Sequence, residues 1–258
     1  MYPILVRFGD FTLHTYGVLL AAGFLLAVLL AREQARHAGI DTNVILDLSF
    51  YLLIGAILGS RLFYVLMNWP EFAGNPLDVL KFWQGGLVFY GGLIFAFLIG
   101  TWYVRKHKLT FQKMADVAAP SIALGQAMGR LGCLSAGCCY GKPTTGFWAA
   151  TFRDPNALAP LGVPLHPTQL YESVATFGIF LALTSMRRLE RFQGRLLWFY
   201  LLFYSTARFI IEFYRGDPRG WAIPGLLSTA QATGIAIALF GLYMILRKKS
   251  VPEAAGKS

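Results

Sequence analysis

The chain has 258 residues, of which 56% are hydrophobic and only 14% are charged. This composition excludes an ordinary soluble globular protein and indicates a membrane protein. The formal net charge of +10 does not require a nucleic-acid partner, because basic loops orient membrane proteins and meet anionic lipid head groups.

Apolar runs of the length expected for membrane-spanning helices follow one another along the chain. The predicted spans are about Tyr16 to Ala31, Val44 to Met67, Gly86 to Val104, Val117 to Gly129, Leu170 to Met186, Leu196 to Tyr214 and Ile223 to Leu246. The fourth is short and contains Pro120, so it is the weakest of the seven signals. Basic residues follow the first span instead of preceding it, so we expect it to stay in the mature protein.

The distribution of positive charge predicts the orientation. If the spans alternate, 14 of the 23 Lys and Arg residues fall on one side of the membrane and 5 on the other. The richer side is the cytoplasmic one. We therefore predict an all-α integral membrane protein of about seven transmembrane helices, with its N-terminus outside and its C-terminus inside. Residues 1–248 form a single polytopic domain, 68–85 and 131–167 a small outer cap, and 249–258 a cytoplasmic tail.

Arginines lie in or at the edge of these spans, where each costs about 2.5 to 3.5 kcal/mol at the bilayer centre. In the sixth span, Arg208, Glu212 and Arg215 are spaced i, i+4 and i+7, on one helical face. Glu212 can neutralise one of the two arginines, so we expect a spare positive charge that favours a lipid phosphate. The alternative is an Arg208–Glu212 lock between helices, with Arg215 extending to the interface.

Two further arginines have different surroundings. Arg61 lies mid-span among small residues, and we expect it to pair with a buried carboxylate. Arg130 ends the fourth span, and Gly129 and Gly132 beside it suggest a close approach of the backbone. The alternative for Arg130 is an anchor at the interface.

All three cysteines, Cys133, Cys138 and Cys139, fall in one predicted outer segment. Their spacing is a poor match to zinc patterns, and His166 would be a fourth ligand only through folding that the spacing does not show, so no metal is predicted. A disulfide with one thiol left over, inert small core residues and a catalytic thiol all remain open. Further on, Thr168 is expected to cap a helix that has Glu172 in its first turns.

Several motifs in order resemble the bacterial prolipoprotein diacylglyceryl transferase family. They are TYGVLLAAGF near the start, GSRLFYVL at 59–66, FWQGGLVFYGGL at 82–93, GQAMGRLGCLSAGCCYGKPT ending at 144, HPTQLYES at 166–173 and ARFIIEFYRGDP at 207–218. The match runs from about residue 3 to 245.

The resemblance implies transfer of the diacylglyceryl group of phosphatidylglycerol to the lipobox cysteine thiol of preprolipoprotein signal peptides, without a cofactor. A thioether forms and glycerol phosphate is released. It also implies a multi-pass protein of the bacterial inner membrane with its site toward the outer leaflet. The catalytic residues it indicates are Arg130, Arg208 and Tyr90, and the substrate-binding residues are Tyr16, Arg61, Gly141, Glu212 and Arg215.

The chain departs from the family pattern at three places. Tyr90 stands where well-known members have a histidine, and Cys133 and Cys138 replace a usual asparagine and a usual acidic residue. A tyrosine is a poor base at neutral pH, because its unperturbed pKa is about 10. The alternatives are therefore a paralogue that uses the same lipid pocket for another acceptor, and a non-catalytic protein that binds or transports phospholipid.

Overall fold

The fold is mostly helical. The computed structural model describes residues 2–9, 11–81, 85–217 and 220–247, so the predicted tail at 249–258 lies outside the described residues. The helices are α1 (Thr15–His37), α2 (Thr42–Met67), α3 (Trp69–Phe72), α4 (Phe89–Lys106), α5 (Phe111–Ala136), α6 (Thr168–Arg187), α7 (Leu196–Glu212) and α8 (Thr229–Leu246), with 3₁₀ turns η1 (Pro76–Leu80) and η3 (Glu190–Phe192). Each predicted span overlaps one of the long helices, and α1, α2 and α8 are long and apolar enough to cross a membrane.

Short strands form three antiparallel pairs. They are β1 (Ile4–Phe8) with β2 (Phe11–His14), β3 (Ala150–Thr151) with β4 (Pro164–Leu165), and β5 (Trp221–Ile223) with β6 (Leu227–Ser228). The last predicted span therefore becomes helical only at Thr229, where Ser228 caps α8 by accepting a hydrogen bond from the backbone N–H of Gln231. The polar capping residue explains why the helix begins there.

The weakest predicted span is one of the longest helices. α5 continues through Pro120 and reaches Ala136, so it extends well beyond the predicted end at Gly129. A proline inside a helix of a membrane protein is tolerated when neighbouring groups satisfy the backbone locally. Ser121 contributes to this by donating a hydrogen bond to the carbonyl of Val117 at 3.0 Å.

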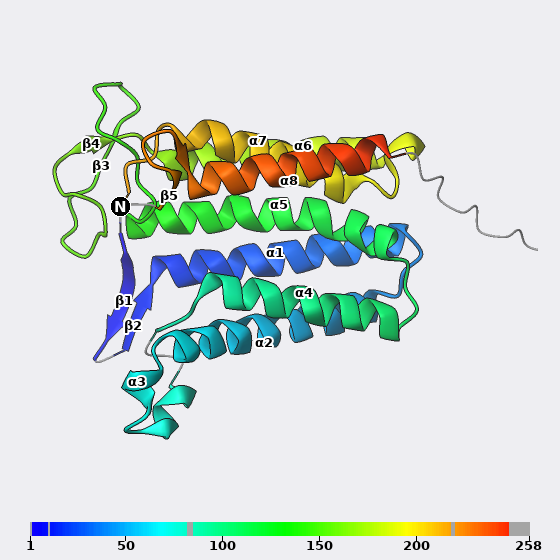
Figure 1. The fold of residues 1–258 in the computed structure, drawn as a ribbon, viewed down its shortest axis with the longest axis horizontal. Coiled ribbons are helices and arrows are strands. Elements are labelled where there is room, and N and C mark those ends of the chain that lie inside the picture. Colours follow the sequence, from blue (N-terminus) through cyan, green and yellow to red (C-terminus); the bar gives the residue numbers. More distant parts are fainter. Residues whose placement is uncertain (1, 10, 82–84, 218–219, 248–258) are drawn as a thin grey trace, which may run out of the picture. The chain divides into compact units, whose positions relative to one another are not determined.

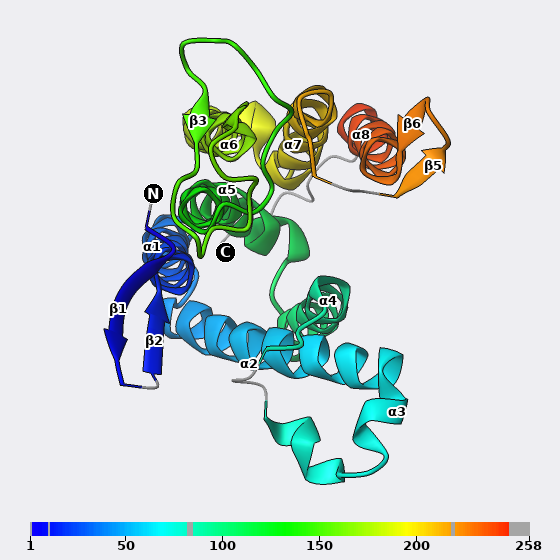
Figure 2. The ribbon, with the colours of Figure 1, turned by 90° about the vertical axis from the view of Figure 1, so that its left-hand side faces the viewer.

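The chain divides into two compact units, residues 1–30 with 115–258 and residues 31–114, and each is described by itself. In the first unit, α5 lies between α1 and α6, as Figures 1 and 2 show. Its buried core joins α5, α6 and α7 through Ala119, Ala123, Ile179, Leu183, Leu196 and Tyr200. On the other side of α5, a Cβ at Gly23 of α1 would lie 2.8 Å from the Cβ of Met128, so glycine permits close helix packing.

In the second unit, α2 and α4 pack with their backbones almost in contact. A Cβ at Gly91 would lie 2.4 Å from the carbonyl oxygen of Gly59, and one at Gly92 would lie 2.4 Å from the hydroxyl of Ser60. Small residues allow membrane helices to approach in this way. This contact holds the start of α4 beside the middle of α2.

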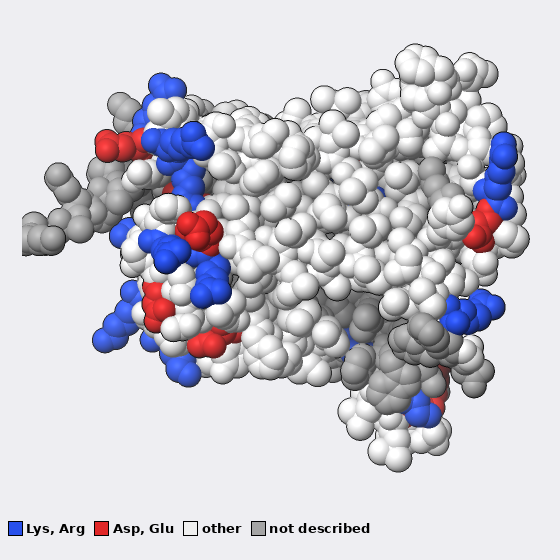
Figure 3. Space-filling view, turned by 180° about the vertical axis from the view of Figure 1, so that it is seen from behind, with Lys and Arg blue, Asp and Glu red and all other residues white. Residues whose placement is uncertain are grey.

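Charged side chains are absent from most of the helix surface seen in Figure 3. On the face seen in Figure 3, Lys, Arg, Asp and Glu gather near the ends of the helices and leave an uncharged surface between. Many large apolar side chains on the helices are exposed, including Leu29 of α1, Leu58 of α2 and Leu239 of α8. Such an arrangement suits contact with lipid hydrocarbon, which requires apolar outer side chains.

Candidate functional site

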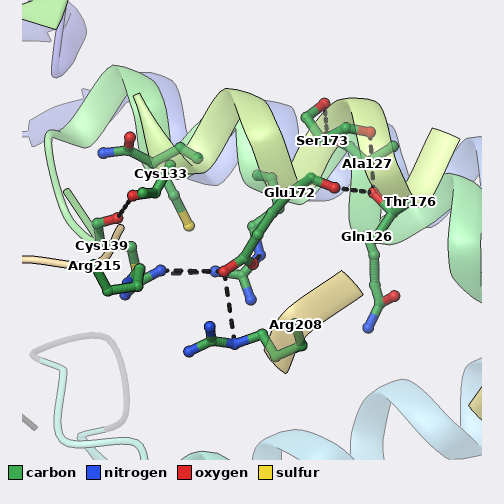
Figure 4. Close-up of polar contacts among 12 residues, drawn as sticks. Gln126, Ala127, Cys133, Cys139, Glu172, Ser173, Thr176, Arg208 and Arg215 are labelled. Carbon is green, nitrogen blue, oxygen red and sulfur yellow. Dashed lines mark hydrogen bonds and ion pairs between the residues drawn. The ribbon is translucent and has the colours of Figure 1, made fainter. Parts of the chain in front are cut away.

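One buried carboxylate gathers three of the four arginines noted in the sequence. Glu172 of α6 has a side chain that is 2% exposed. Its Oε2 lies 2.5 Å from Arg130 Nε, and its Oε1 lies 3.2 Å from Arg215 Nη1 and 3.6 Å from Arg208 Nε. Figure 4 shows the Glu172 side chain reaching from α6 toward Arg215 and Arg208. A single buried anion therefore links α5, α7 and the segment after α7.

Two more carboxylates complete the cluster. Glu212 Oε2 lies 2.6 Å from Arg208 Nη1, and Asp217 accepts hydrogen bonds from Nε and Nη2 of Arg215 at 2.8 and 2.9 Å. The paired Arg215–Asp217 contact is the fork geometry that gives guanidinium–carboxylate pairs their specificity. We call Arg130, Glu172, Arg208, Glu212, Arg215 and Asp217 the Glu172 network.

The predicted spare positive charge on the Arg208–Arg215 stripe is wrong. The Glu172 network holds three guanidinium groups and three carboxylates, so its formal charges balance. The prediction considered only the charges nearby in the sequence, whereas Glu172 lies 43 residues before Arg215. Balance is expected on physical grounds, because an uncompensated buried charge is strongly destabilising.

Sequence reasoning placed Glu172 in a helix but gave it no role. A signal for it was present, since Thr168, Gln169, Glu172, Ser173 and Thr176 are polar residues at helical spacing in an otherwise apolar segment. All five are buried in α6. A polar stripe inside a membrane helix faces the interior of the bundle and marks a candidate site.

Some guanidinium N–H groups of the Glu172 network make no contact with its carboxylates. Nη2 of Arg130 and Nη2 of Arg208 form no hydrogen bond or ion pair with the residues the structure describes. The side chain of Arg130 is 23% exposed and that of Arg208 is 11% exposed, against 2% for Arg215. Arg130 and Arg208 are therefore the two members suited to bind an incoming phosphate, and Arg215 is held within the protein.

Arg215 is not on the helical face that its spacing predicted. α7 ends at Glu212, and Arg215 follows in a segment that pairs with Gly141. The alternative that Arg215 extends to the membrane interface is also wrong, because the residue is only 5% exposed. Its carboxylate partners fix it on both sides.

Gly141 has a packing reason to be glycine. A Cβ at this position would lie 2.5 Å from the Cβ of His166 and 2.8 Å from the carbonyl oxygen of Tyr214. The Gly141 N–H donates a hydrogen bond to the carbonyl of His166 at 3.0 Å, so two backbone segments lie in direct contact here. Its predicted role in substrate binding remains a prediction, and its visible role is to place Arg215.

Glu212 and Tyr16 also lie in the first unit. Oε1 of Glu212 accepts a hydrogen bond from the Ser228 hydroxyl at 2.9 Å, which ties the N-terminal cap of α8 to the network. Tyr16, in the first turn of α1, packs on the backbone of Gly132, where an added Cβ would lie 3.2 Å from its ring. At 39% exposed, Tyr16 is accessible near Arg130.

The cysteine-containing loop is held by α6. Thr168 donates its hydroxyl to the carbonyl of Cys139 and Gln169 donates its amide to the carbonyl of Cys138, both at 2.7 Å. Thr168 is the first residue of α6 and makes no capping bond, so the predicted cap is wrong. All three cysteines are free thiols. The neighbouring thiols of Cys133 and Cys138 and the nearby Arg215 guanidinium lower the pKa of the Cys139 thiol.

Arg61 belongs to the second unit, and it pairs with no carboxylate among the described residues, so the predicted pairing is not observed. Its guanidinium donates to the backbone carbonyls of Asp78, Val79, Gly85 and Gly86 at 2.6 to 3.3 Å. The rings of Tyr64 and Phe72 flank it, with centroids 5.6 and 5.3 Å away. Buried carbonyl groups need hydrogen-bond donors, and one guanidinium serves several of them here at once.

Tyr90 also lies in the second unit, near the start of α4. It is 69% exposed, and its ring contacts that of Phe89. Among the described residues no hydrogen bond reaches its hydroxyl group. Its predicted catalytic role, like the substrate-binding role of Arg61, remains a prediction.

Comparison with known proteins gives a consistent result. The family model described as prolipoprotein diacylglyceryl transferase matches residues 3–247. A phosphatidylglycerol–prolipoprotein diacylglyceryl transferase of Clostridium tetani is 35% identical over 245 residues, covering 95% of this chain and 96% of the relative. A second, from Bacillus mycoides, is 34% identical and covers 97% of this chain and 93% of the relative. The chain belongs to the prolipoprotein diacylglyceryl transferase family.

Proposed function

We propose that this protein transfers the diacylglyceryl group of phosphatidylglycerol to the lipobox cysteine thiol of preprolipoprotein signal peptides. The reaction takes place in the bacterial inner membrane, at a site toward the outer leaflet. Family membership across nearly the whole chain supports the reaction. The observation that carries the assignment of the site is the pair of unengaged guanidinium donors, on Arg130 and Arg208, around the buried Glu172.

The chemistry explains why arginines are needed. The acceptor sulfur forms a bond to the glyceryl carbon, the bond from that carbon to the phosphate oxygen breaks, and glycerol phosphate leaves. The proton of the thiol ends on the released phosphate or in water. Negative charge grows on the departing phosphate, and fixed guanidinium groups in a low-dielectric site stabilise it. The attacking thiol comes from the substrate protein, so the protein's own cysteines need not be nucleophiles.

Glu172 and Arg215 act as positioning residues in this proposal. Three guanidinium groups surround the Glu172 carboxylate and hold it within the protein. Its contacts orient Arg130 and Arg208 toward the substrate phosphate. Arg215 contacts Oε1 of Glu172 and is itself held by Asp217.

The proposal includes the topology. Residues 1–248 form one polytopic domain with seven spans, the N-terminus outside and the C-terminus inside. The test is labelling of single cysteines by an impermeant maleimide on intact cells, in a variant with the native cysteines changed to serine. Asn156→Cys, in the loop after α5, should react from outside, and Gln193→Cys, between α6 and α7, should react only after permeabilisation. The reverse result would contradict the orientation.

The activity is tested by mass spectrometry of a lipobox peptide incubated with the purified protein and phosphatidylglycerol. We expect the peptide to gain one diacylglyceryl group while glycerol phosphate is released. Arg130→Ala should abolish both products, whereas Arg153→Ala, at an exposed position in the loop after α5, should not. Full activity of Arg130→Ala would overturn the site.

A related function uses the same lipid pocket for a different acceptor. The observation in its favour is the thiol-rich loop beside Arg130, where Cys139 Sγ lies 3.9 Å from Arg130 Nη1. An unmodified lipobox peptide, together with measured binding of phosphatidylglycerol, would support this second reading. Covalent transfer to the peptide would exclude both it and a purely lipid-binding or transport role.

A further inference from the structure

The three cysteines converge in space although their spacing matches no metal motif. The Sγ atoms of Cys133, Cys138 and Cys139 all lie within 4.8 Å of one another, and all three residues are half-buried. Cys133 comes from the last turns of α5, and the other two come from the loop that follows. The fold thus assembles a three-thiol cluster that the linear pattern C-x4-C-C does not predict.

The backbone around the cluster is held in an uncommon conformation. Cys139 has a φ of 62°, in the left-handed region that residues other than glycine seldom adopt. Hydrogen bonds from Gln169 and Thr168 fix the carbonyls of Cys138 and Cys139. Conformations of this kind persist only where the surrounding structure enforces them, and they cluster at functional sites.

We infer that Cys133, Cys138 and Cys139 bind one soft, thiophilic divalent cation such as Zn²⁺. Thiolates select this class of metal. Zinc–sulfur bonds of about 2.3 Å place two ligand sulfurs about 3.8 Å apart, so modest side-chain rotations close the observed cluster onto an ion. His166 is not part of this cluster, so the described residues supply three ligands and leave a position for an exogenous one.

The charge around the cluster suits such a complex. Three thiolates and a divalent cation carry a formal charge of −1. Arg130 Nη1 lies 3.9 Å from Cys139 Sγ, and the Arg215 guanidinium is near enough to that sulfur to interact with it electrostatically. Guanidinium donors beside the sulfurs offset the excess negative charge, as outer partners of metal ligands commonly do. The cation therefore sits beside the Glu172 network but does not depend on the transfer reaction.

The test is anaerobic titration of the full-length protein with Co²⁺ in detergent, without a histidine tag and after reduction with a phosphine. We expect one equivalent to bind with a sulfur-to-cobalt charge-transfer band, and Zn²⁺ to displace it. Cys133→Ser, Cys138→Ser and Cys139→Ser should each lose most of that band. Ser135→Ala, two residues after Cys133, should bind like the wild type, because among the described residues the Ser135 hydroxyl is bonded to the carbonyl of Leu131 alone.

Two results would overturn the inference. One is the absence of a charge-transfer band in the reduced wild-type protein. The other is a disulfide in the protein as isolated, detected as one alkylatable thiol in place of three when metal is first removed. Peptide modification is measured on the same preparations. Cobalt binding without transfer would refute the proposed function alone, and transfer without cobalt binding would refute the metal site alone.

Discussion

Two regions of this protein bury arginines in membrane-type helices, and they satisfy them in different ways. In the first unit, Arg130, Arg208 and Arg215 surround the carboxylate of Glu172, and Arg130 and Arg208 keep unengaged donors. In the second unit, Arg61 donates to four backbone carbonyls of the loop after α2. Around Glu172, guanidinium donors are left over that an anionic ligand can reach, whereas the donors of Arg61 are engaged by the carbonyls of a loop. The groups that an arginine contacts therefore indicate whether it is suited to bind a ligand or to hold the protein backbone.

The largest expected effect is a loss of transfer when Arg130 or Arg208, the arginines around Glu172, is replaced. Arg130→Ala and Arg208→Ala should each lower the rate of transfer by about 1,000-fold, the upper range for loss of one donor that stabilises developing charge. Rates are measured by mass spectrometry of the modified peptide at saturating phosphatidylglycerol. The variants should still insert and purify as folded protein. Rates within about threefold of the wild type would place the chemistry elsewhere.

Replacing the central carboxylate should affect stability as well as activity. Glu172→Gln keeps the size of the side chain but leaves the guanidinium groups short of one negative charge. Breaking a buried ion pair in this way costs about 3 to 5 kcal/mol. We expect a lower unfolding temperature in detergent and a lower rate of transfer. The matched control is Glu190→Gln, at an exposed position outside the network, and an equal shift in both variants would refute the central role of Glu172.

Arg61→Lys should lower the stability of the protein more than its rate of transfer. Lysine keeps the charge but lacks the planar fork that reaches several carbonyls at once. Hydrogen bonds to charged groups contribute about 1.5 to 3 kcal/mol each, so we expect about 2 kcal/mol of lost stability. Transfer per folded molecule should fall by less than about tenfold. A loss as large as that of Arg130→Ala, with unchanged stability, would instead assign Arg61 to the substrate site.

Gly141→Ala tests how the backbone places Arg215. The added methyl group would meet His166 at 2.5 Å, and overpacking of this kind costs about 1 to 3 kcal/mol. Gly178→Ala on α6, where nothing lies within 4 Å of the new Cβ, is the control and should be neutral or slightly stabilising. Unfolding temperature and transfer rate are measured for both. Equal behaviour of the two variants would mean that the crossing at Gly141 tolerates a side chain.

The smallest expected effect concerns the thiols. Changing Cys133, Cys138 and Cys139 together to serine should leave the transfer rate within about tenfold of the wild type under reducing conditions, because the acceptor thiol comes from the peptide. The readout is again the modified peptide, measured beside Arg208→Ala. Complete loss of transfer in the serine variant would instead give the cysteines a direct part in the reaction.

Local contacts were predicted well and distant ones poorly. The Arg208–Glu212 pair follows from i, i+4 spacing and is present at 2.6 Å. The partners of Arg61 were missed because carbonyls in a loop leave no pattern in the residue types. Glu172 was missed because the prediction of a spare charge considered only the sixth span. Arg215 was misplaced because the end of α7 at Glu212 interrupts the helical spacing.

The sequence by itself determined the helical segments, because each apolar run must satisfy its own backbone in hydrocarbon. It also determined which arginines interrupt those runs and, through the order of its motifs, the family. Only the tertiary structure decided that Glu172 balances Arg130, Arg208 and Arg215, and that three cysteines without a metal motif meet at one point. The first outcome depends on packing α6 against α5 and α7, which brings together residues that are far apart along the chain. The second depends on the path of the loop after α5, whose carbonyls at Cys138 and Cys139 are held by Gln169 and Thr168 of α6.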